Sequence, residues 1–170
     1  MRRKITEQLI VWKNRLDRMP LLLNGARQVG KTYSALTFGK EYYKNTAYFN
    51  FEDAKDVNAI FERDLDPERI IKELAAKKGQ SIIKGDTLII FDEIQACERA
   101  LTSLKYFCEQ APGYHIIAAG SLLGVAVNKK NFSFPVGKVE MLSMFPLDFE
   151  EFLWALGEEK LADLISEAFK

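Results

Sequence analysis

One eight-residue segment of this chain matches the pattern G-x-x-x-x-G-K-S/T, which needs a strand before it and a helix after it. The segment consists of Gly25, Ala26, Arg27, Gln28, Val29, Gly30, Lys31 and Thr32. An apolar run typical of a buried strand, residues 21–23, precedes it, and a helical stretch to about Lys40 follows. Glycines in such a loop let backbone N–H groups converge on phosphate oxygens at the positive end of the helix. The segment therefore predicts a phosphate-binding loop.

The last two residues of the loop have separate roles in this interpretation. The Lys31 ammonium group would lie beside the β- and γ-phosphates of a nucleotide, and the Thr32 hydroxyl would ligate Mg²⁺. The alternative is a glycine turn that only begins a helix. The strand before the segment and the helix after it favour the phosphate loop.

A second candidate site follows the apolar run Thr87 to Phe91, which predicts a strand covered on both faces. Asp92 and Glu93 come directly after it. The carboxyl ends of parallel strands meet at one edge of a sheet, so Asp92 is expected near the loop, where it can hold magnesium through water. Glu93 is the type of residue that orients and deprotonates an attacking water. The alternatives are a helix N-cap for Asp92 and a solvated first-turn acid for Glu93.

Ser121 follows the predicted strand 114–119 and is the third catalytic candidate beside Glu93 and Lys31. If that strand lies between the two just described, the Ser121 hydroxyl could touch the γ-phosphate or the attacking water. A serine after a glycine is also a common helix cap, and the two interpretations are left open.

Strands and helices alternate along the chain, with further strands predicted at 47–51 and 139–144. Right-handed crossovers turn this order into an α/β fold, a parallel sheet between two helical layers. We expect a single domain over residues 1–170, with an amphipathic helix within 1–19 and two closing helices within 146–170. The apolar face of the first helix is expected to carry Ile5, Leu9, Trp12 and Leu16.

Composition excludes several other classes of protein. The 24 lysines and arginines balance 24 aspartates and glutamates, so nucleic-acid binding has no support from overall charge. Two cysteines, Cys97 and Cys108, and one histidine, His115, are too few for a zinc site and give no disulfide framework. The longest apolar run is about six residues. We expect a cytoplasmic protein with no membrane span.

Two patterns that the sequence lacks bear on which nucleotide binds and which reaction follows. The guanine-specific pattern Asn-Lys-x-Asp does not occur, because Asn128-Lys129 is followed by Lys130 and Asn131. Small-molecule kinases usually bind two phosphates with arginines of a lid segment. No arginine occurs after Arg99. The adjacent acids at 92–93 instead favour hydrolysis of ATP.

The chain resembles the bacterial and archaeal AAA-type ATPases, P-loop NTPases in which a C-terminal domain of unknown function follows the ATPase domain. The resemblance rests on LLLNGARQVGKT (21–32), DEIQ (92–95), AGSLL (119–123) and FPVGKVEMLSMFPLDFEEFL (134–153). It implies strand order 5-1-4-3-2, ATP on the loop, and magnesium and water at Asp92 and Glu93. Family members are commonly longer, so it also implies that this chain is the N-terminal ATPase portion, without the C-terminal domain.

Two functions follow from the motifs and the resemblance. The first is Mg²⁺-dependent binding and hydrolysis of ATP to ADP, which drives or gates an attached domain or partner. The alternative is an ATP-dependent binding switch with negligible turnover. The sequence does not identify the partner, which could be another protein, the family's C-terminal domain or a second copy in a homo-oligomer.

Overall fold

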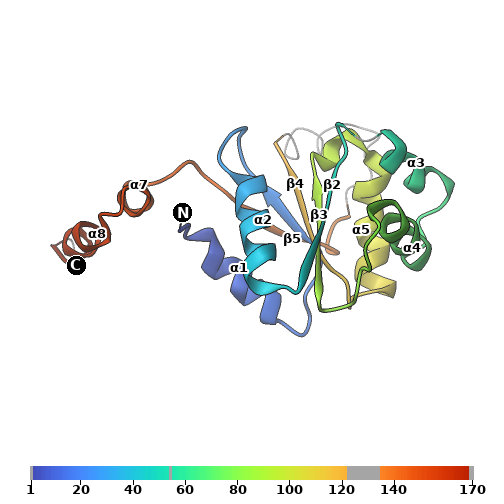
Figure 1. Cartoon of the computed structure of the whole chain (residues 1–170), viewed down its shortest axis with the longest axis horizontal. Coiled ribbons are helices and arrows are strands. Elements are labelled where there is room, and N and C mark those ends of the chain that lie inside the picture. The colour runs from blue at the N-terminus through green and yellow to red at the C-terminus, as the bar shows by residue number, and fades with distance from the viewer. Residues whose placement is uncertain (1, 54, 122–134, 169–170) are drawn as a thin grey trace.

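Five parallel strands form the sheet of this protein, in a computed structural model that describes residues 2–53, 55–121 and 135–168 (Figure 1). The strands are β1 (Leu21–Asn24), β2 (Asn45–Asn50), β3 (Thr87–Asp92), β4 (His115–Gly120) and β5 (Glu140–Ser143). Their order is β2-β3-β4-β1-β5, and every pairing is parallel. Read from the other edge, this is the predicted order 5-1-4-3-2.

Helices cover both faces of the sheet and confirm the three-layer arrangement (Figure 1). One face carries α1 (Ile5–Asn14) and α2 (Lys31–Tyr42). The other carries α3 (Lys55–Arg63), α4 (Pro67–Lys78) and α5 (Glu98–Gln110). A short 3₁₀ helix, η1 (Ile94–Ala96), follows β3, and the described chain ends with α7 (Phe149–Ala155) and α8 (Glu159–Ala168).

The alternation of side chains along the strands divides the core into two clusters. Leu22 packs on the side of α3, α4 and α5, while its neighbours Leu21 and Leu23 pack on the side of α1 and α2. All six residues of β3 and of β4 are buried, as a central strand between two helical layers requires. Each fully buried leucine, isoleucine or phenylalanine contributes about 1.5–3 kcal/mol through removal from water. This core fixes the sheet edge where the candidate site lies.

The first helix is shorter than predicted, and the prediction for Leu16 is wrong. Helix α1 ends at Asn14, Arg15 has extended backbone angles, and Leu16 is fully exposed. The chain turns here because the indole N–H of Trp12 donates to the Met19 carbonyl, which brings the chain back toward β1. The other predicted apolar residues of this helix are buried.

Two other helices differ from the expectation. Helix α3 was not predicted, although Val57, Ile60 and Phe61 recur with helical spacing and are buried. Helix α7 begins at Phe149, later than the expected 146, because a capping box sets its first turn. Asp148 accepts from the Glu151 amide, and the Glu151 side chain accepts from the Asp148 amide.

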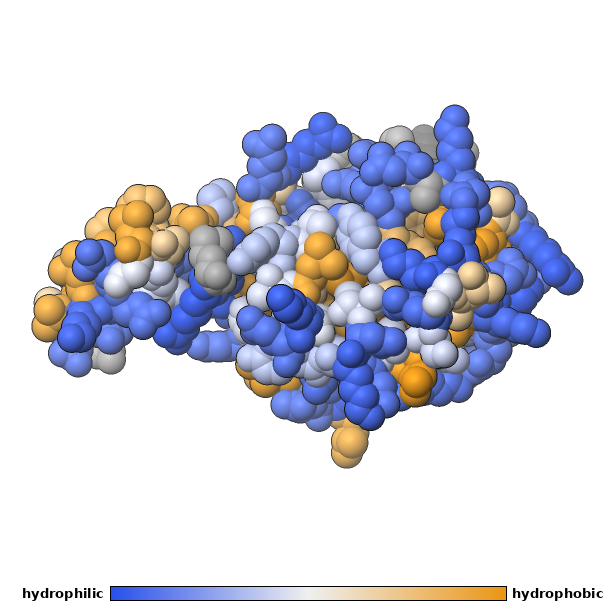
Figure 2. Space-filling view, in the orientation of Figure 1, coloured by the Kyte–Doolittle hydropathy of each residue, from blue (hydrophilic) through white to orange (hydrophobic). Residues whose placement is uncertain are grey.

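Helices α7 and α8 extend away from the sheet, beside the N-terminal end of α1 (Figure 1). Apolar side chains gather on the surface over these two helices (Figure 2). The exposed ones are Phe145, Phe149, Phe152, Leu156, Leu161 and Leu164. None of the described helices is long and apolar enough to cross a membrane.

Candidate functional site

The glycine loop connects the end of β1 to the start of α2, as the sequence predicts. A Cβ atom at Gly25 would lie 2.3 Å from the Met144 carbonyl oxygen, so no side chain fits at this position. Gly30 has φ +92° and is the N-cap of α2, a conformation that strains any other residue. Gln28 is also left-handed, with φ 64°. Positions 25 and 30 of the loop therefore need glycine, as the motif predicts.

The Lys31 side chain folds back over this loop. Its Nζ donates to the carbonyls of Gly25 at 2.9 Å and Ala26 at 2.7 Å. Lys31 is buried, and this burial lowers the pKa of its ammonium group. The ammonium group is therefore held inside the curve of the loop, where a phosphate group would need a counter-charge.

Thr32 and Asp92 meet, although 60 residues separate them in the sequence. The Thr32 hydroxyl donates to Asp92 Oδ2 at 2.8 Å, and Asp92 Oδ1 accepts from the Glu93 amide at 3.0 Å. Asp92 is 4% exposed at the carboxyl end of β3. Hydroxyl and carboxylate oxygens are the ligand types that Mg²⁺ prefers, so the pair fits the expected metal site.

Tyr48 belongs to this cluster and was not predicted from the sequence. Its hydroxyl donates to Asp92 Oδ2 at 2.8 Å from the middle of β2, the strand next to β3. Burial and the Asp92 carboxylate raise the pKa of Tyr48 to about 12, so the hydroxyl stays protonated at neutral pH. The alternation along β2 places this side chain on the α2 face of the sheet, but its partner depends on strand order, which local sequence does not encode.

Glu93 lies at the rim of the loop with its backbone in the left-handed region, φ 48°. Its carboxylate accepts a hydrogen bond from the amide of Gln95, the side chain two residues further along. Gln95 Oε1 is buried and has no hydrogen-bond partner among the described residues. The Gln95 side chain therefore holds the Glu93 carboxylate in place, a contact that was not predicted from the sequence.

Ser121 follows β4 directly, and β4 lies between β1 and β3, as the expected contact with the γ-phosphate or the attacking water requires. Its hydroxyl oxygen is buried and has no hydrogen-bond partner among the described residues. A buried hydroxyl without a partner is costly unless a ligand or water satisfies it. The geometry thus fits a ligand contact, whereas a helix cap there would lie outside the described residues.

A hollow of about 570 Å³ lies beside the loop, and Lys31, Thr32 and Glu93 are among its lining residues, whereas Asp92, Tyr48 and Ser121 are not. It is lined by Arg27, Gln28, Gly30, Lys31, Thr32, Tyr33, Glu52 and Glu93. Arg27 is exposed, and its guanidinium lies 4.0 Å from the Glu52 carboxylate at the edge of the hollow. Lysines 129 and 130 lie outside the described residues.

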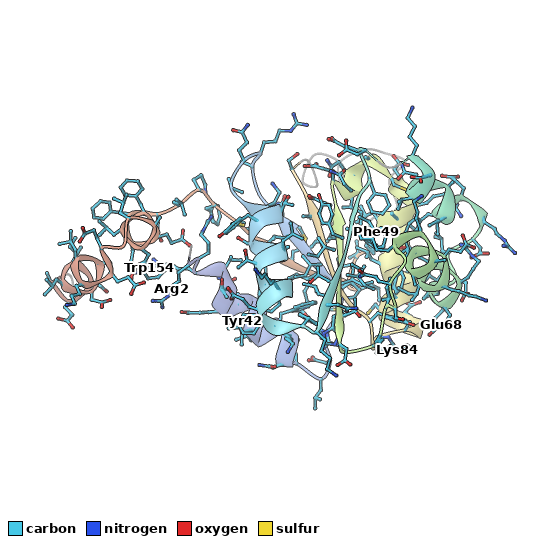
Figure 3. The ribbon with its side chains drawn as sticks, viewed as in Figure 1. Arg2, Tyr42, Phe49, Glu68, Lys84 and Trp154 are labelled. Carbon is cyan, nitrogen blue, oxygen red and sulfur yellow. The ribbon has the colours of Figure 1, made fainter. Side chains whose placement is uncertain are left out.

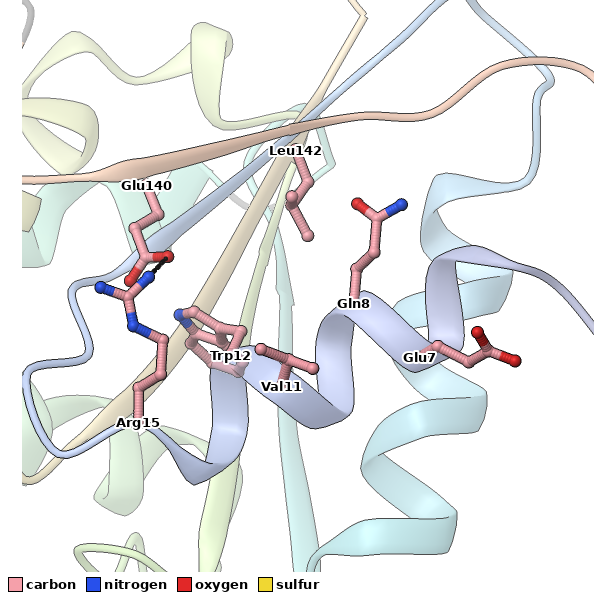
Figure 4. Close-up of a pocket in the computed structure, with 7 residues that line it drawn as sticks. All are labelled: Glu7, Gln8, Val11, Trp12, Arg15, Glu140 and Leu142. Carbon is pink, nitrogen blue, oxygen red and sulfur yellow. Dashed lines mark hydrogen bonds and ion pairs between the residues drawn. The ribbon is translucent and has the colours of Figure 1, made fainter.

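A second hollow, of about 350 Å³, lies between α1 and β5 (Figure 4). Its floor is apolar, with Trp12 and Leu142, and the ion pair between Arg15 and Glu140 lies at one end. It contains no loop N–H groups and no nucleophile beside a base. The chemical groups converge on the glycine loop instead, so this is the candidate site.

The remaining candidate residues are structural. His115 is buried and its Nδ1 lies 2.8 Å from the Tyr43 hydroxyl oxygen. Cys97 and Cys108 are free thiols, and Cys97 is buried. Within the described ranges no group of three or more histidine, cysteine, aspartate and glutamate residues could hold a metal ion.

The sheet order, the glycine loop and the acid at the end of β3 define a phosphate-loop nucleotide-binding protein of the ATPase type. The sequence model of the AAA domain matches residues 17–153, and the chain belongs to this family.

A structure of the ORC2 protein of Aeropyrum pernix, in its ADP form, has the same fold with a TM-score of 0.55. At 16% identity, this likeness concerns the fold alone. It covers 91% of this chain and 50% of the other, so the chain spans about half the length of that protein. The comparison with curated proteins finds no match.

Proposed function

We propose that this chain binds ATP with Mg²⁺ at the glycine loop and hydrolyses it, with Glu93 acting on the attacking water. The observation that carries the proposal is the 2.8 Å contact between the Thr32 hydroxyl and the Asp92 carboxylate, beside the Lys31 ammonium group. The Aeropyrum pernix protein that shares the fold is described in an ADP form, which supports a nucleotide as the ligand. The absent guanine motif favours ATP over GTP, which competition between the two nucleotides tests.

Each residue has a distinct task in this proposal. Lys31 exchanges the carbonyls of Gly25 and Ala26 for phosphate oxygens, and the loop N–H groups bind the same phosphates. Thr32 and Asp92 hold the magnesium ion, which neutralises charge on the β- and γ-phosphates when bound.

The acid and the serine complete the site. Glu93, held by Gln95, orients a water and takes its proton, and Ser121 contacts the γ-phosphate or that water. We further propose that the nucleotide cycle drives or gates a domain or protein partner.

The decisive experiment compares two variants with the parent chain. Glu93→Gln should bind Mg-ATP with unchanged affinity and lose phosphate release by ~10²-fold or more, because it removes the base but not the binding groups. Lys31→Ala should lose affinity steeply in calorimetry. Glu98→Gln, an exposed first-turn acid of α5, is the matched control and should keep both properties.

The outcomes separate the two functions. If the parent binds Mg-ATP but releases no phosphate above the rate in buffer, the chain is a binding switch. If Lys31→Ala binds ATP as tightly as the parent does, the loop is not the nucleotide site.

A further inference from the structure

The first three described residues, Arg2, Arg3 and Lys4, hold helix α7. The Arg2 guanidinium lies 4.2 Å from the ring centroid of Trp154 on α7 (Figure 3). Lys4 pairs with Asp148 at 2.7 Å and with Glu150 at 2.6 Å. These contacts lie at the surface, where ion pairs contribute little because water screens them.

Arg3 differs from its two neighbours because it is buried, with 5% of its surface exposed. Its Nε donates to Glu151 Oε1 at 3.0 Å, Nη1 donates to the Val29 carbonyl at 2.9 Å, and Nη2 donates to the Phe145 carbonyl at 2.8 Å. The three partners belong to α7, the glycine loop and the segment after β5. The planar guanidinium donates to the three partners from three separate nitrogens, whereas the donors of an ammonium group all lie on one nitrogen.

The loop contact fixes a peptide that the proposed function uses. The carbonyl of Val29 and the N–H of Gly30 belong to one planar trans peptide, so the two groups point in opposite directions. By holding the carbonyl, Arg3 directs the Gly30 N–H away from itself, and Gly30 lines the hollow of the candidate site. Arg3 therefore sets the direction of one amide of the glycine loop.

The α7 contact is equally well defined. Glu151 Oε1 also accepts from the Lys4 amide at 2.8 Å, and Oε2 accepts from the Asp148 amide at 3.2 Å in the capping box. The carboxylate is thus fixed to the first turn of α7 and is 6% exposed on its side chain. A movement of the Val29 carbonyl would therefore be passed to α7 through the Arg3 guanidinium, which contacts both Val29 and Glu151.

We propose that Arg3 is a positioning residue for the glycine loop and that, through Glu151, it couples the occupancy of the loop to the ordering of α7. The inference rests on the proposed binding of ATP at the loop. A nucleotide that fixes the Val29–Gly30 peptide strengthens the Arg3 contacts and orders α7. Because such coupling is reciprocal for binding, loosening Glu151 on α7 weakens binding at the loop.

Hydrogen exchange of the full chain, with and without saturating Mg-ATP, tests the coupling together with calorimetric affinities. In the parent, amides of residues 149–155 should exchange more slowly when Mg-ATP is bound. Arg3→Lys and Glu151→Gln should each weaken Mg-ATP binding by about fivefold or more and remove this protection. Glu150→Gln, the neighbouring acid that pairs only at the surface, is the matched control and should behave as the parent does.

A double variant, Arg3→Met with Glu151→Gln, guards against simple unfolding, because it leaves no unpaired buried charge and keeps a side chain that can accept from the Asp148 amide. It should fold with α7 in place yet show no protection of α7 by Mg-ATP. If the parent binds Mg-ATP while exchange in 149–155 stays unchanged, or if Glu151→Gln binds as tightly as the parent, the coupling is refuted and the ATP site stands. If the parent does not bind Mg-ATP, the proposed function fails as well.

Discussion

The hydroxyl groups of Tyr48 and Thr32 both donate to one oxygen of Asp92, each at 2.8 Å. If the proposed magnesium ion took the Thr32 hydroxyl as a ligand, Tyr48 would still hold the Asp92 carboxylate in place. Tyr48→Phe keeps the ring and removes this hydrogen bond. It should raise the Mg²⁺ concentration needed for half-maximal ATP binding by about tenfold, since groups that orient a metal ligand contribute 10–100-fold to metal affinity. A Mg²⁺ titration of nucleotide binding measures the shift.

Electron spin resonance measures the binding of Mn²⁺ in place of Mg²⁺. It therefore provides a readout for Tyr48→Phe that does not depend on turnover. Tyr106→Phe, on α5, serves as the control and should leave the titration unchanged. Superimposable Mg²⁺ titrations of Tyr48→Phe and the parent would show that the Tyr48 hydroxyl only fills space.

At the scale of elements, His115 at the start of β4 makes the free energy of unfolding depend on pH. Burial of His115, with help from the charges of Arg18 and Lys13, lowers its pKa to about 4. In the unfolded chain the same group has its ordinary pKa near 6.5. The unfolded state therefore binds a proton between pH 6.5 and 4 that the native state does not bind, and stability falls as the pH drops through this window.

His115→Asn removes this titration. Between pH 7 and pH 5 the parent should lose about 2 kcal/mol more of its free energy of unfolding than the variant loses. Urea denaturation at the two pH values measures the difference, and the carboxylates contribute equally to both proteins. Parallel losses in the two proteins would contradict the buried, neutral histidine.

At the scale of the whole molecule, the arginines determine the expected rate of turnover. An arginine that reaches the transferring phosphoryl group contributes ~10³ to 10⁵ in rate. The sequence contains none after Arg99, and Arg3 is fully engaged by its three partners. Arg27 lies at the edge of the hollow beside Glu52. We therefore expect this chain to hydrolyse ATP far more slowly than the ~10 s⁻¹ of a median enzyme.

Steady-state phosphate release over a wide range of protein concentration tests this expectation. A rate that rises with concentration would show that a second copy supplies the missing charge. Arg27→Lys is the matched variant, and an unchanged slow rate would show that Arg27 does not supply the charge in the isolated chain. Fast release that is independent of concentration would show that one chain holds a complete site.

Local sequence patterns were enough to predict the loop, the parallel sheet and the acids that follow β3. These features depend on local spacing: apolar runs mark the buried strands, and two glycines before Lys31-Thr32 mark the loop. The helical spacing of Val57, Ile60 and Phe61 is also a local pattern, and it would have predicted α3. Strand order came from the family resemblance, and the structure confirms it.

The distant side chains that contact the site could not be predicted from local sequence, because their partners depend on how the chain folds. Tyr48 reaches Asp92 across 44 residues, and Arg3 reaches Glu151 across 148. In the sequence, Arg3 is one of three successive cationic residues before a helix, with nothing local to distinguish it from Arg2 or Lys4. Its role comes from burial, because a guanidinium without water must find its hydrogen-bond partners within the protein, and the packing of α1 against the loop and α7 supplies them.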